Sequence, residues 1–189
     1  MKSRILCILF LLFTIAINAE NIEVPRLSPL PVRVMNERVA LSGKWLFNPA
    51  PEPEFWEKES VRKWKNIEVP GEWVMQGFEV EKGKAAGYFR TFTIPAAWQG
   101  QRVKLRCNGV YSDAQVYING KKAGSHLGGF TAFELDVTDL VRVGAENRIA
   151  MAVTSETIAD STSNASRYAV HPLGGITRDI FLFALPETN

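Results

Sequence analysis

Short stretches in which apolar and polar residues alternate recur along this chain, and each is bounded by Gly, Pro, Asn or Asp. A period of two places successive side chains on opposite faces, as in a strand with one buried face. Short strands separated by closely spaced turn signals favour an antiparallel β-sandwich or jelly roll, so the predicted fold class is all-β. The pattern predicts about eight strands, at residues 39–47, 65–69, 88–94, 102–107, 114–118, 132–135, 148–154 and 178–185.

Helical signals are weak by comparison with this alternation. Residues 52–64, 95–98 and 138–141 can each form one or two turns. The side-chain oxygen of Asp136 or Thr138 is placed to cap the last of these turns. We therefore expect single helical turns between strands rather than long helices.

The stretch from 117 to 141 is rich in residues that permit tight turns. Asn119-Gly120 predicts a two-residue hairpin because both residues tolerate positive φ. Gly128-Gly129 allows the chain to bend before alternation resumes, and no GxxxxGK[ST] pattern supports a phosphate-binding loop. The apolar residues expected to face the core after this bend are Phe130, Phe133, Leu135 and Val137.

The first nineteen residues resemble a secretory signal peptide. Lys2 and Arg4 precede an apolar run, and the small residues Ala16 and Ala19 follow it, which predicts cleavage after Ala19 and export to the periplasm or the cell exterior. An uncleaved membrane anchor is the alternative, but the run is shorter than the roughly 20 residues that a spanning helix needs. Residues 20–38, which contain three prolines, are expected to form an extended arm before a single domain at 39–189.

Charge and cysteine content exclude several classes of function for the exported part. Removal of Lys2 and Arg4 reduces the 22 basic residues to 20, against 20 acidic ones, so no basic excess indicates nucleic acid. Cys107 is then the one cysteine, and its strand-like surroundings favour a buried structural thiol over a nucleophile. Two histidines and one cysteine offer little for a transition metal, so no metal or other cofactor is predicted.

Four segments resemble the N-terminal sugar-binding domain of glycoside hydrolase family 2, the family of β-galactosidases, β-glucuronidases and β-mannosidases. They follow the order of the family and cover nearly all of the chain after about residue 40. The resemblance implies a β-sandwich like that of galactose-binding domains. The segments are residues 67–79 (IEVPGEWVMQGFE), 87–124 (GYFRTFTIPAAWQGQRVKLRCNGVYSDAQVYINGKKAG), 128–153 (GGFTAFELDVTDLVRVGAENRIAMAV) and 174–183 (GGITRDIFLF).

The resemblance also implies partners for this domain. Family members continue with an immunoglobulin-like domain and a (β/α)₈ barrel, whose two glutamates hydrolyse terminal β-glycosidic bonds with retention from positions about 5 to 5.5 Å apart. Both glutamates are expected beyond Asn189, so the chain itself is expected to be a non-catalytic sugar-binding and scaffold domain with no membrane contact after signal cleavage. The acidic residues within the chain are expected to be solvated surface charge: Glu52, Glu54, Glu57, Glu59, Glu79 and Glu81.

Candidate substrate-binding residues lie in the long segment 154–179. By position, Asp160 is similar to the acidic residue that hydrogen-bonds sugar hydroxyls in the family, and the alternative is a turn or capping role. Tyr168 and His171 offer a stacking platform for a sugar ring, or else pack against the barrel. Arg178 and Asp179 match a terminal-strand motif of the family, for which an interdomain or intrastrand ion pair is expected.

Galactose specificity is not supported on one side of the expected site. Residues 80–89 (VEKGKAAGYF) contain no asparagine, whereas β-galactosidases have there a longer segment whose asparagine reaches the substrate. A free-standing carbohydrate-binding module and a purely structural domain are the alternative functions. Titration of residues 20–189 with carbohydrates separates them, because only a module needs to bind sugar by itself.

Overall fold

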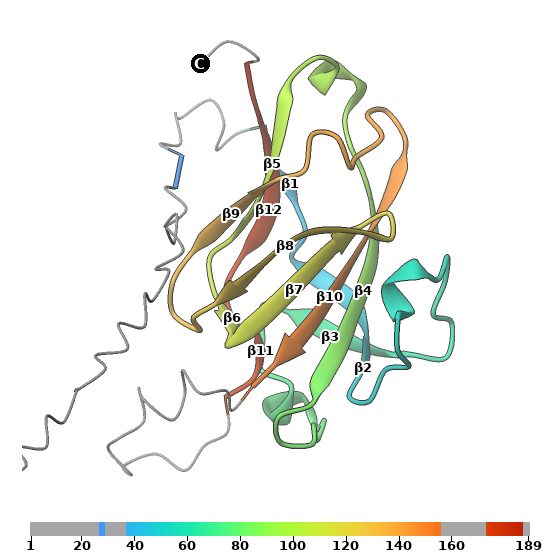
Figure 1. The fold of residues 1–189 in the computed structure, drawn as a ribbon, viewed down its shortest axis with the longest axis vertical. Helices are drawn as coiled ribbons and strands as arrows, with labels where there is room; N and C mark the ends of the chain where they lie inside the picture. The colour runs from blue at the N-terminus through green and yellow to red at the C-terminus, as the bar shows by residue number, and fades with distance from the viewer. Residues whose placement is uncertain (1–26, 29–36, 156–172, 187–189) are drawn as a thin grey trace, which may run out of the picture.

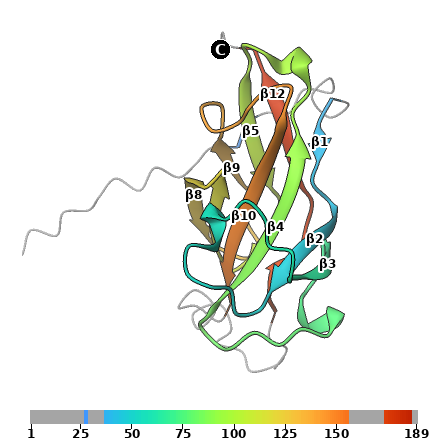
Figure 2. The ribbon, with the colours of Figure 1, turned by 90° about the vertical axis from the view of Figure 1, so that its right-hand side faces the viewer.

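The computed structural model describes residues 27–28, 37–155 and 173–186, and it contains two antiparallel sheets packed face to face (Figures 1 and 2). The predicted all-β antiparallel sandwich is confirmed. The larger sheet has six strands in the order β3-β2-β4-β10-β7-β8, which are Lys65–Val69, Gly43–Asn48, Ala85–Thr93, Glu146–Thr154, Asp113–Ile118 and Lys121–Leu127. The smaller sheet has the order β1-β12-β5-β9, which are Val39–Ala40, Ile180–Leu185, Arg102–Cys107 and Phe133–Asp136.

A third, two-stranded sheet closes one end of the sandwich. It pairs β6 (Val110–Tyr111) with β11 (Gly175–Ile176). Three single-turn 3-10 helices lie in the connections: η1 (Phe55–Glu57), η2 (Val74–Gln76) and η3 (Ala96–Trp98). Within the described ranges, no helix has the length and apolar character needed to cross a membrane.

The single strand predicted at 39–47 is wrong, because this stretch forms two strands in different sheets. β1 pairs with β12 in the smaller sheet, and β2 pairs with β3 and β4 in the larger one. The alternation of side chains continues across the break, but Gly43 has a φ of 109°, which permits the change of direction. Arg90 stabilises the crossing, since its Nη1 donates to the carbonyl oxygens of Leu41 and Ser42 at 2.8 and 2.9 Å.

The core lies between the inner faces of the two sheets. β4 and β10 are paired over nine positions at the centre of the larger sheet, and they face β5 and β12. Burying a large apolar side chain contributes roughly 1.5 to 3 kcal/mol, so this layer dominates the stability of the fold. Cys107 lies in it with no exposed surface, which confirms the structural thiol. The largest fully buried side chains are Trp45, Trp73, Tyr88, Phe47, Phe133 and Phe183.

The hairpin predicted at Asn119-Gly120 is confirmed. Asn119 and Gly120 have φ values of 51° and 84°, and Ile118 pairs directly with Lys121. The strand that follows, β8, is an edge strand with mostly exposed or half-buried side chains, so its sequence lacks the apolar alternation of the core strands. The expected cap after β9 is also confirmed, because Asp136 Oδ1 accepts a hydrogen bond from the Thr138 N–H at 3.1 Å.

A buried carboxylate lies on the outer face of the smaller sheet. Glu134 accepts hydrogen bonds from Arg106 Nη1 at 3.1 Å and from the backbone N–H of Ser28 at 3.0 Å, and Lys104 Nζ lies 3.5 Å away. The Lys104 Nζ also bonds the Ser28 hydroxyl at 2.7 Å. Ser28 is one of four described residues of the predicted arm, so this contact ties the arm to the sheet. The predicted signal peptide, 1–19, lies outside the described residues.

Candidate functional site

Several loops meet at the end of the sandwich where β10 ends and β11 begins, and we call this region the loop end. It is defined by Trp73, Tyr111, Thr154 and Gly174. The three predicted sugar-binding residues, Asp160, Tyr168 and His171, belong to the segment that joins Thr154 to Gly174. They lie outside the described residues and stay predictions, but the structure describes the frame that holds both ends of their segment.

Trp73 fixes the returning side of this segment. Its backbone N–H donates to the Gly174 carbonyl at 3.1 Å, and the Gly71 N–H donates to the Ile176 carbonyl at 2.8 Å. The Trp73 ring lies so close that a Cβ added at Gly174 would approach its Cζ2 to 2.0 Å. Gly174 is therefore needed for the backbone to cross the ring.

Tyr111 and Ser112 fix the departing side. The peptide bond between them is cis, and the Ser112 N–H donates to the Thr154 carbonyl at 3.1 Å, where the segment leaves β10. The Gly128 N–H donates in turn to the Ser112 carbonyl at 2.8 Å. Both attachment points, Thr154 and Gly174, are thus hydrogen-bonded to the sandwich.

Phe130 is exposed at the loop end, so its predicted place in the core is wrong. The bend at Gly128-Gly129 takes it out of the alternation, and 65% of its surface is accessible. Its ring meets Tyr111 edge to face with centroids 5.3 Å apart. The other residues predicted to face the core after the bend, Phe133 and Val137, are buried, and Leu135 is half-buried and packs against the core.

Arg178 and Asp179 line a shallow depression of about 500 Å³ beside Phe130 and Arg106. Both are exposed. Among the described residues, the structure contains no ion pair between them, so the expected intrastrand pair is absent there. The alternative, an ion pair with another domain, stays a prediction.

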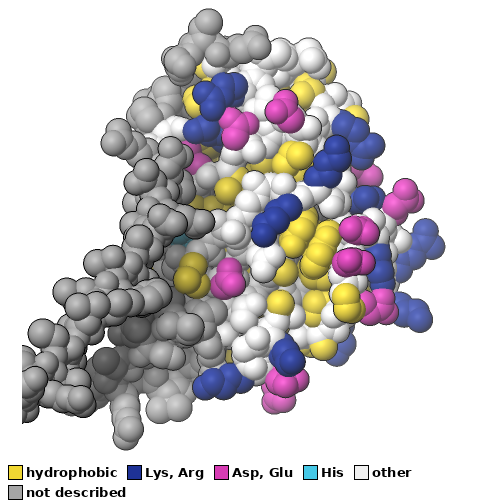
Figure 3. All heavy atoms as spheres, viewed as in Figure 1, with side chains coloured by type: hydrophobic (Ala, Val, Ile, Leu, Met, Phe, Trp, Pro, Cys, Tyr) yellow, Lys and Arg dark blue, Asp and Glu magenta, His cyan; other side chains and the backbone are white. Residues whose placement is uncertain are grey.

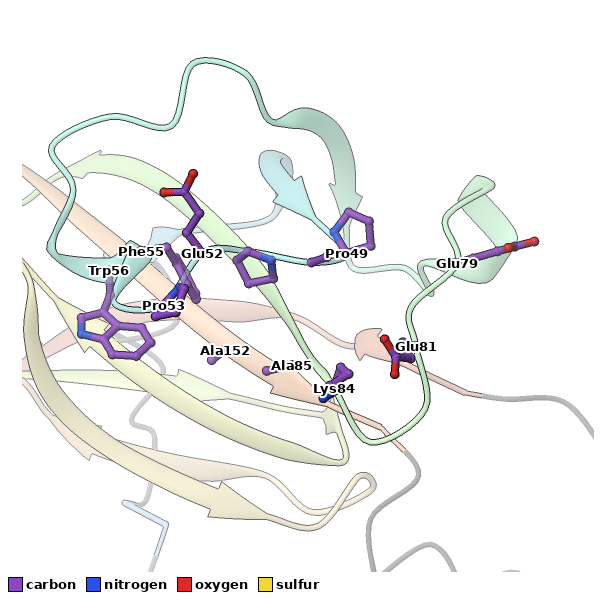
Figure 4. A pocket seen from close by; sticks show the side chains of 12 residues that line it. Pro49, Glu52, Pro53, Phe55, Trp56, Glu79, Glu81, Lys84, Ala85 and Ala152 are labelled. Atoms are coloured by element: carbon purple, nitrogen blue, oxygen red, sulfur yellow. The ribbon is translucent and has the colours of Figure 1, made fainter.

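A deeper hollow of about 510 Å³ opens on the outer face of the larger sheet, next to the point where β10 ends (Figure 4). Ala85 of β4 and Ala152 of β10 form its floor. Residues 49–56 make one wall and residues 79–84 the other. Its lining is mostly apolar, and Trp56 stands at one side with Lys84 and Glu81 at the opposite side.

The hollow exists because the aromatic cover of this sheet face is incomplete. Trp64 lies on Gly87, where an added Cβ would come within 2.4 Å of the ring. Trp56 stacks on Tyr117 with centroids 4.2 Å apart and planes 5° from parallel. Between these two covered areas the small side chains of Ala85 and Ala152 form a low floor, in which Ala85 is half-buried and Ala152 is 7% exposed.

The charged groups around the hollow lie in solvent. All six glutamates predicted to be surface charge are exposed, which confirms that prediction. Glu52 forms an ion pair with Lys58, whose hydrogen bond and charge hold the pKa of Glu52 below its usual value. Partial burial raises the pKa of Asp113 on β7, and the charges of Lys122 and His126 oppose this shift. Because these glutamates lie in solvent, the hollow does not provide the burial that would poise one carboxyl group as an acid beside a second as a nucleophile.

The described residues also contain no group of three or more His, Cys, Asp or Glu side chains that could hold a metal ion. His126 stacks on Phe133 with centroids 4.4 Å apart, as expected for a side chain of the hairpin. In the hollow, the described groups that could contact a ligand are the aromatic ring of Trp56 and the polar groups of Glu81 and Lys84. The hollow was not predicted from the sequence, although Trp56 among prolines and glutamates was a signal that an aromatic side chain lies near the surface.

Comparison with known proteins gives a family match over most of the chain. A family model described as "Glycosyl hydrolases family 2, sugar binding domain" matches residues 39–186. A β-galactosidase of Priestia megaterium is 27% identical over 79% of this chain and 17% of its own length. A β-glucuronidase of Bacteroides fragilis is 31% identical over 66% of this chain and 18% of its own length.

Solved structures agree with these matches. A glycosyl hydrolase family 2 member from Bacteroides cellulosilyticus superposes with a TM-score of 0.64 and 31% identity, covering 79% of this chain and 21% of that one. A β-glucuronidase from an uncultured Clostridium species superposes with a TM-score of 0.69 and 25% identity, covering 86% and 31%. The chain therefore spans less than a third of the length of each of these relatives.

Proposed function

Since the chain belongs to the sugar binding domain of glycosyl hydrolases family 2, we propose that it serves as the non-catalytic N-terminal domain of an exported glycoside hydrolase. The whole protein hydrolyses terminal β-glycosidic bonds of carbohydrates with retention of configuration. This domain supports an immunoglobulin-like domain and a (β/α)₈ barrel, which supplies the two catalytic glutamates.

One observation carries this proposal: the family match covers a single domain, and in this domain both ends of the candidate sugar-binding segment are attached to the sandwich. Relatives named as β-galactosidases and β-glucuronidases match the chain over less than a third of their length, which is consistent with one domain of a larger enzyme. Trp73 and Ser112 hold the two ends of the segment that contains Asp160, Tyr168 and His171. A segment held at both ends can present an acidic and an aromatic group to a sugar at the rim of a neighbouring active site.

The experiment is an assay of the protein that contains this chain together with the domains that follow it. We expect hydrolysis of p-nitrophenyl β-D-galactopyranoside or p-nitrophenyl β-D-glucuronide, with the β-anomer as the first product seen by proton NMR. An α-anomer as first product would contradict the retaining mechanism. No hydrolysis of either glycoside would contradict the hydrolase assignment.

The contribution of the loop segment is tested in the same protein. Asp160→Ala is expected to raise KM about tenfold, because a hydrogen bond to a sugar hydroxyl is lost. Asp139→Ala is the matched control, since Asp139 is an exposed aspartate in the turn after β9. A KM that changes equally in both variants would show that Asp160 makes no sugar contact.

A further inference from the structure

We propose that the hollow between residues 49–56 and 79–84 is a binding site for a neutral pyranose ring, which stacks on Trp56. This inference rests on the proposed function for its carbohydrate ligand and goes beyond it, because the chain would bind sugar by itself, as a carbohydrate-binding module does, through residues other than those of the loop end. Figure 3 shows apolar side chains gathered on this face of the molecule, with acidic and basic side chains along the edge.

Trp56 is held as a rigid platform. One face of its ring lies on Tyr117, whose hydroxyl donates to Gln115 Oε1 at 3.1 Å. Phe55 is buried and meets Trp56 edge to face with centroids 5.2 Å apart. Arg148 Nη2 donates to the Glu57 carbonyl at 3.3 Å and so ties η1 to β10. The rest of the half-buried Trp56 side chain lines the hollow, where it offers an aromatic surface to the apolar face of a sugar.

The floor has the size and shape for one or two sugar rings. Ala85 and Ala152 are the smallest side chains that a strand can present while keeping its β geometry, and they leave the space beside Trp56 open. The volume of about 510 Å³ lies within the range of small-molecule sites in proteins.

Polar groups stand opposite the platform, as recognition of hydroxyl groups requires. Figure 4 shows Glu81 and Lys84 across the floor from Trp56. A carboxylate accepts hydrogen bonds from sugar hydroxyls and an ammonium group donates to their oxygens. The hollow thus has an aromatic ring at one side of an apolar floor and an acceptor and a donor at the other side, so a pyranose can make apolar contact and hydrogen bonds there.

The charge of the lining selects against acidic sugars. Three carboxylates, those of Glu52, Glu79 and Glu81, line the hollow against one ammonium group, that of Lys84. Glu52 is compensated by Lys58, which leaves an excess of negative charge. A uronate would be repelled, whereas a neutral hexopyranose would not, so the hollow is expected to prefer galactose-like or glucose-like rings to glucuronate.

The test is a titration of the full chain followed by NMR of the Trp56 indole N–H and the Ala152 methyl group. The probes are methyl β-D-galactopyranoside, methyl β-D-glucopyranoside and methyl β-D-glucuronide. We expect millimolar binding of at least one neutral glycoside with shifts of both signals, and weaker binding of the glucuronide. Added salt should reduce the difference in affinity between the neutral glycosides and the glucuronide, because ions screen the repulsion between the carboxylates.

Three variants separate this site from others. Trp56→Ala removes the platform and Ala152→Leu fills the floor, and each is expected to weaken binding of the neutral glycoside at least about tenfold. Leu127→Ala is the control, because Leu127 is an exposed apolar residue on β8 that does not line the hollow, and it should leave binding unchanged. If Trp56→Ala does not fold, Ala152→Leu decides by itself.

No binding by the wild-type chain, or binding that survives Ala152→Leu, overturns the proposal. Binding of the glucuronide as tight as that of both neutral glycosides overturns its charge argument. Failure here is distinct from failure of the proposed function, which is judged by hydrolysis and product stereochemistry in the longer protein.

Discussion

The indole ring of Trp73 lies against the backbone of Gly174, and the backbone N–H of Trp73 donates to the Gly174 carbonyl at 3.1 Å. This pair sets the place where the predicted sugar-binding segment rejoins the sandwich. Because Trp73 is almost completely buried, its ring has no room to move away from a larger residue.

Gly174→Ala is expected to destabilise the domain by about 3 kcal/mol, since the added Cβ would overlap the buried ring. Urea denaturation of the variant measures this. Gly100→Ala is the control, because Gly100 has a φ of 73° but no atom within 4 Å of an added Cβ, so it should cost about 1 kcal/mol of backbone strain. Equal costs for the two variants would contradict a packing role for Gly174.

Asn147→Ala is expected to destabilise the domain by about 3 kcal/mol. The buried Asn147 side chain accepts from the Arg142 N–H at 2.7 Å and from Asn119 Nδ2 at 2.8 Å, and it donates to the carbonyls of Arg142 and Ala145. Its removal leaves several of these groups without partners. Thermal melting of the variant should be compared with that of Asn48→Ala, which loses one exposed hydrogen bond and should cost less than about 1 kcal/mol.

Glu134→Gln should destabilise the domain by about 3 kcal/mol, because Lys104 and Arg106 would keep their charges without the buried carboxylate between them. The side chain of Glu134 is 3% exposed and that of each cation is 17% exposed. Breaking the exposed pair between Arg102 and Asp136 by Arg102→Ala should cost less than about 1 kcal/mol. The prediction fails if guanidinium denaturation gives the same free energy of unfolding for Glu134→Gln as for the wild-type protein.

Stability is expected to fall as pH is lowered from 7.5 to 5.5, in part through His126. Burial lowers the pKa of His126 below its usual 6.5, although the Gly128 backbone and the charge of Asp113 oppose this. The unfolded chain then binds a proton near pH 6.5 that the folded chain still excludes, so the stability from the neutral ring is complete above this pH and is lost below it. Urea denaturation across this range should show a shallower decline in His126→Gln. If the free energy of unfolding declines with pH as steeply in His126→Gln as in the wild-type protein, other groups cause the decline.

Local signals in the sequence predicted much of the sandwich. The strands at 65–69 and 102–107 were placed correctly at both ends, since alternation and turn residues determine them locally. The sequence did not show that 39–47 divides between two sheets, because both halves alternate in the same way. It also missed β6 and β11, each of two residues, whose pairing depends on contacts far apart along the chain.

The candidate site was harder to predict than the fold. Asp160, Tyr168 and His171 came from resemblance and lie outside the described residues, so their roles remain predictions. The hollow depends on how the connection from β2 to β3 folds over the sheet, and only the structure shows that Trp56 lies on Tyr117 while the small side chains of Ala85 and Ala152 form a floor beside it. Sequence patterns record which residues are apolar, but not which of them a neighbouring loop covers.

The pairing of β1 with β12 has a consequence for how the protein is made. Val39 pairs with Leu182, which lies 182 − 39 = 143 positions later, and β12 stands between β1 and β5. During synthesis β5 can pair with β9, but β1 cannot join the smaller sheet until β12 has left the ribosome. Until then β1 and one edge of β5 are unpaired, and a chaperone or a second nascent chain can bind to them.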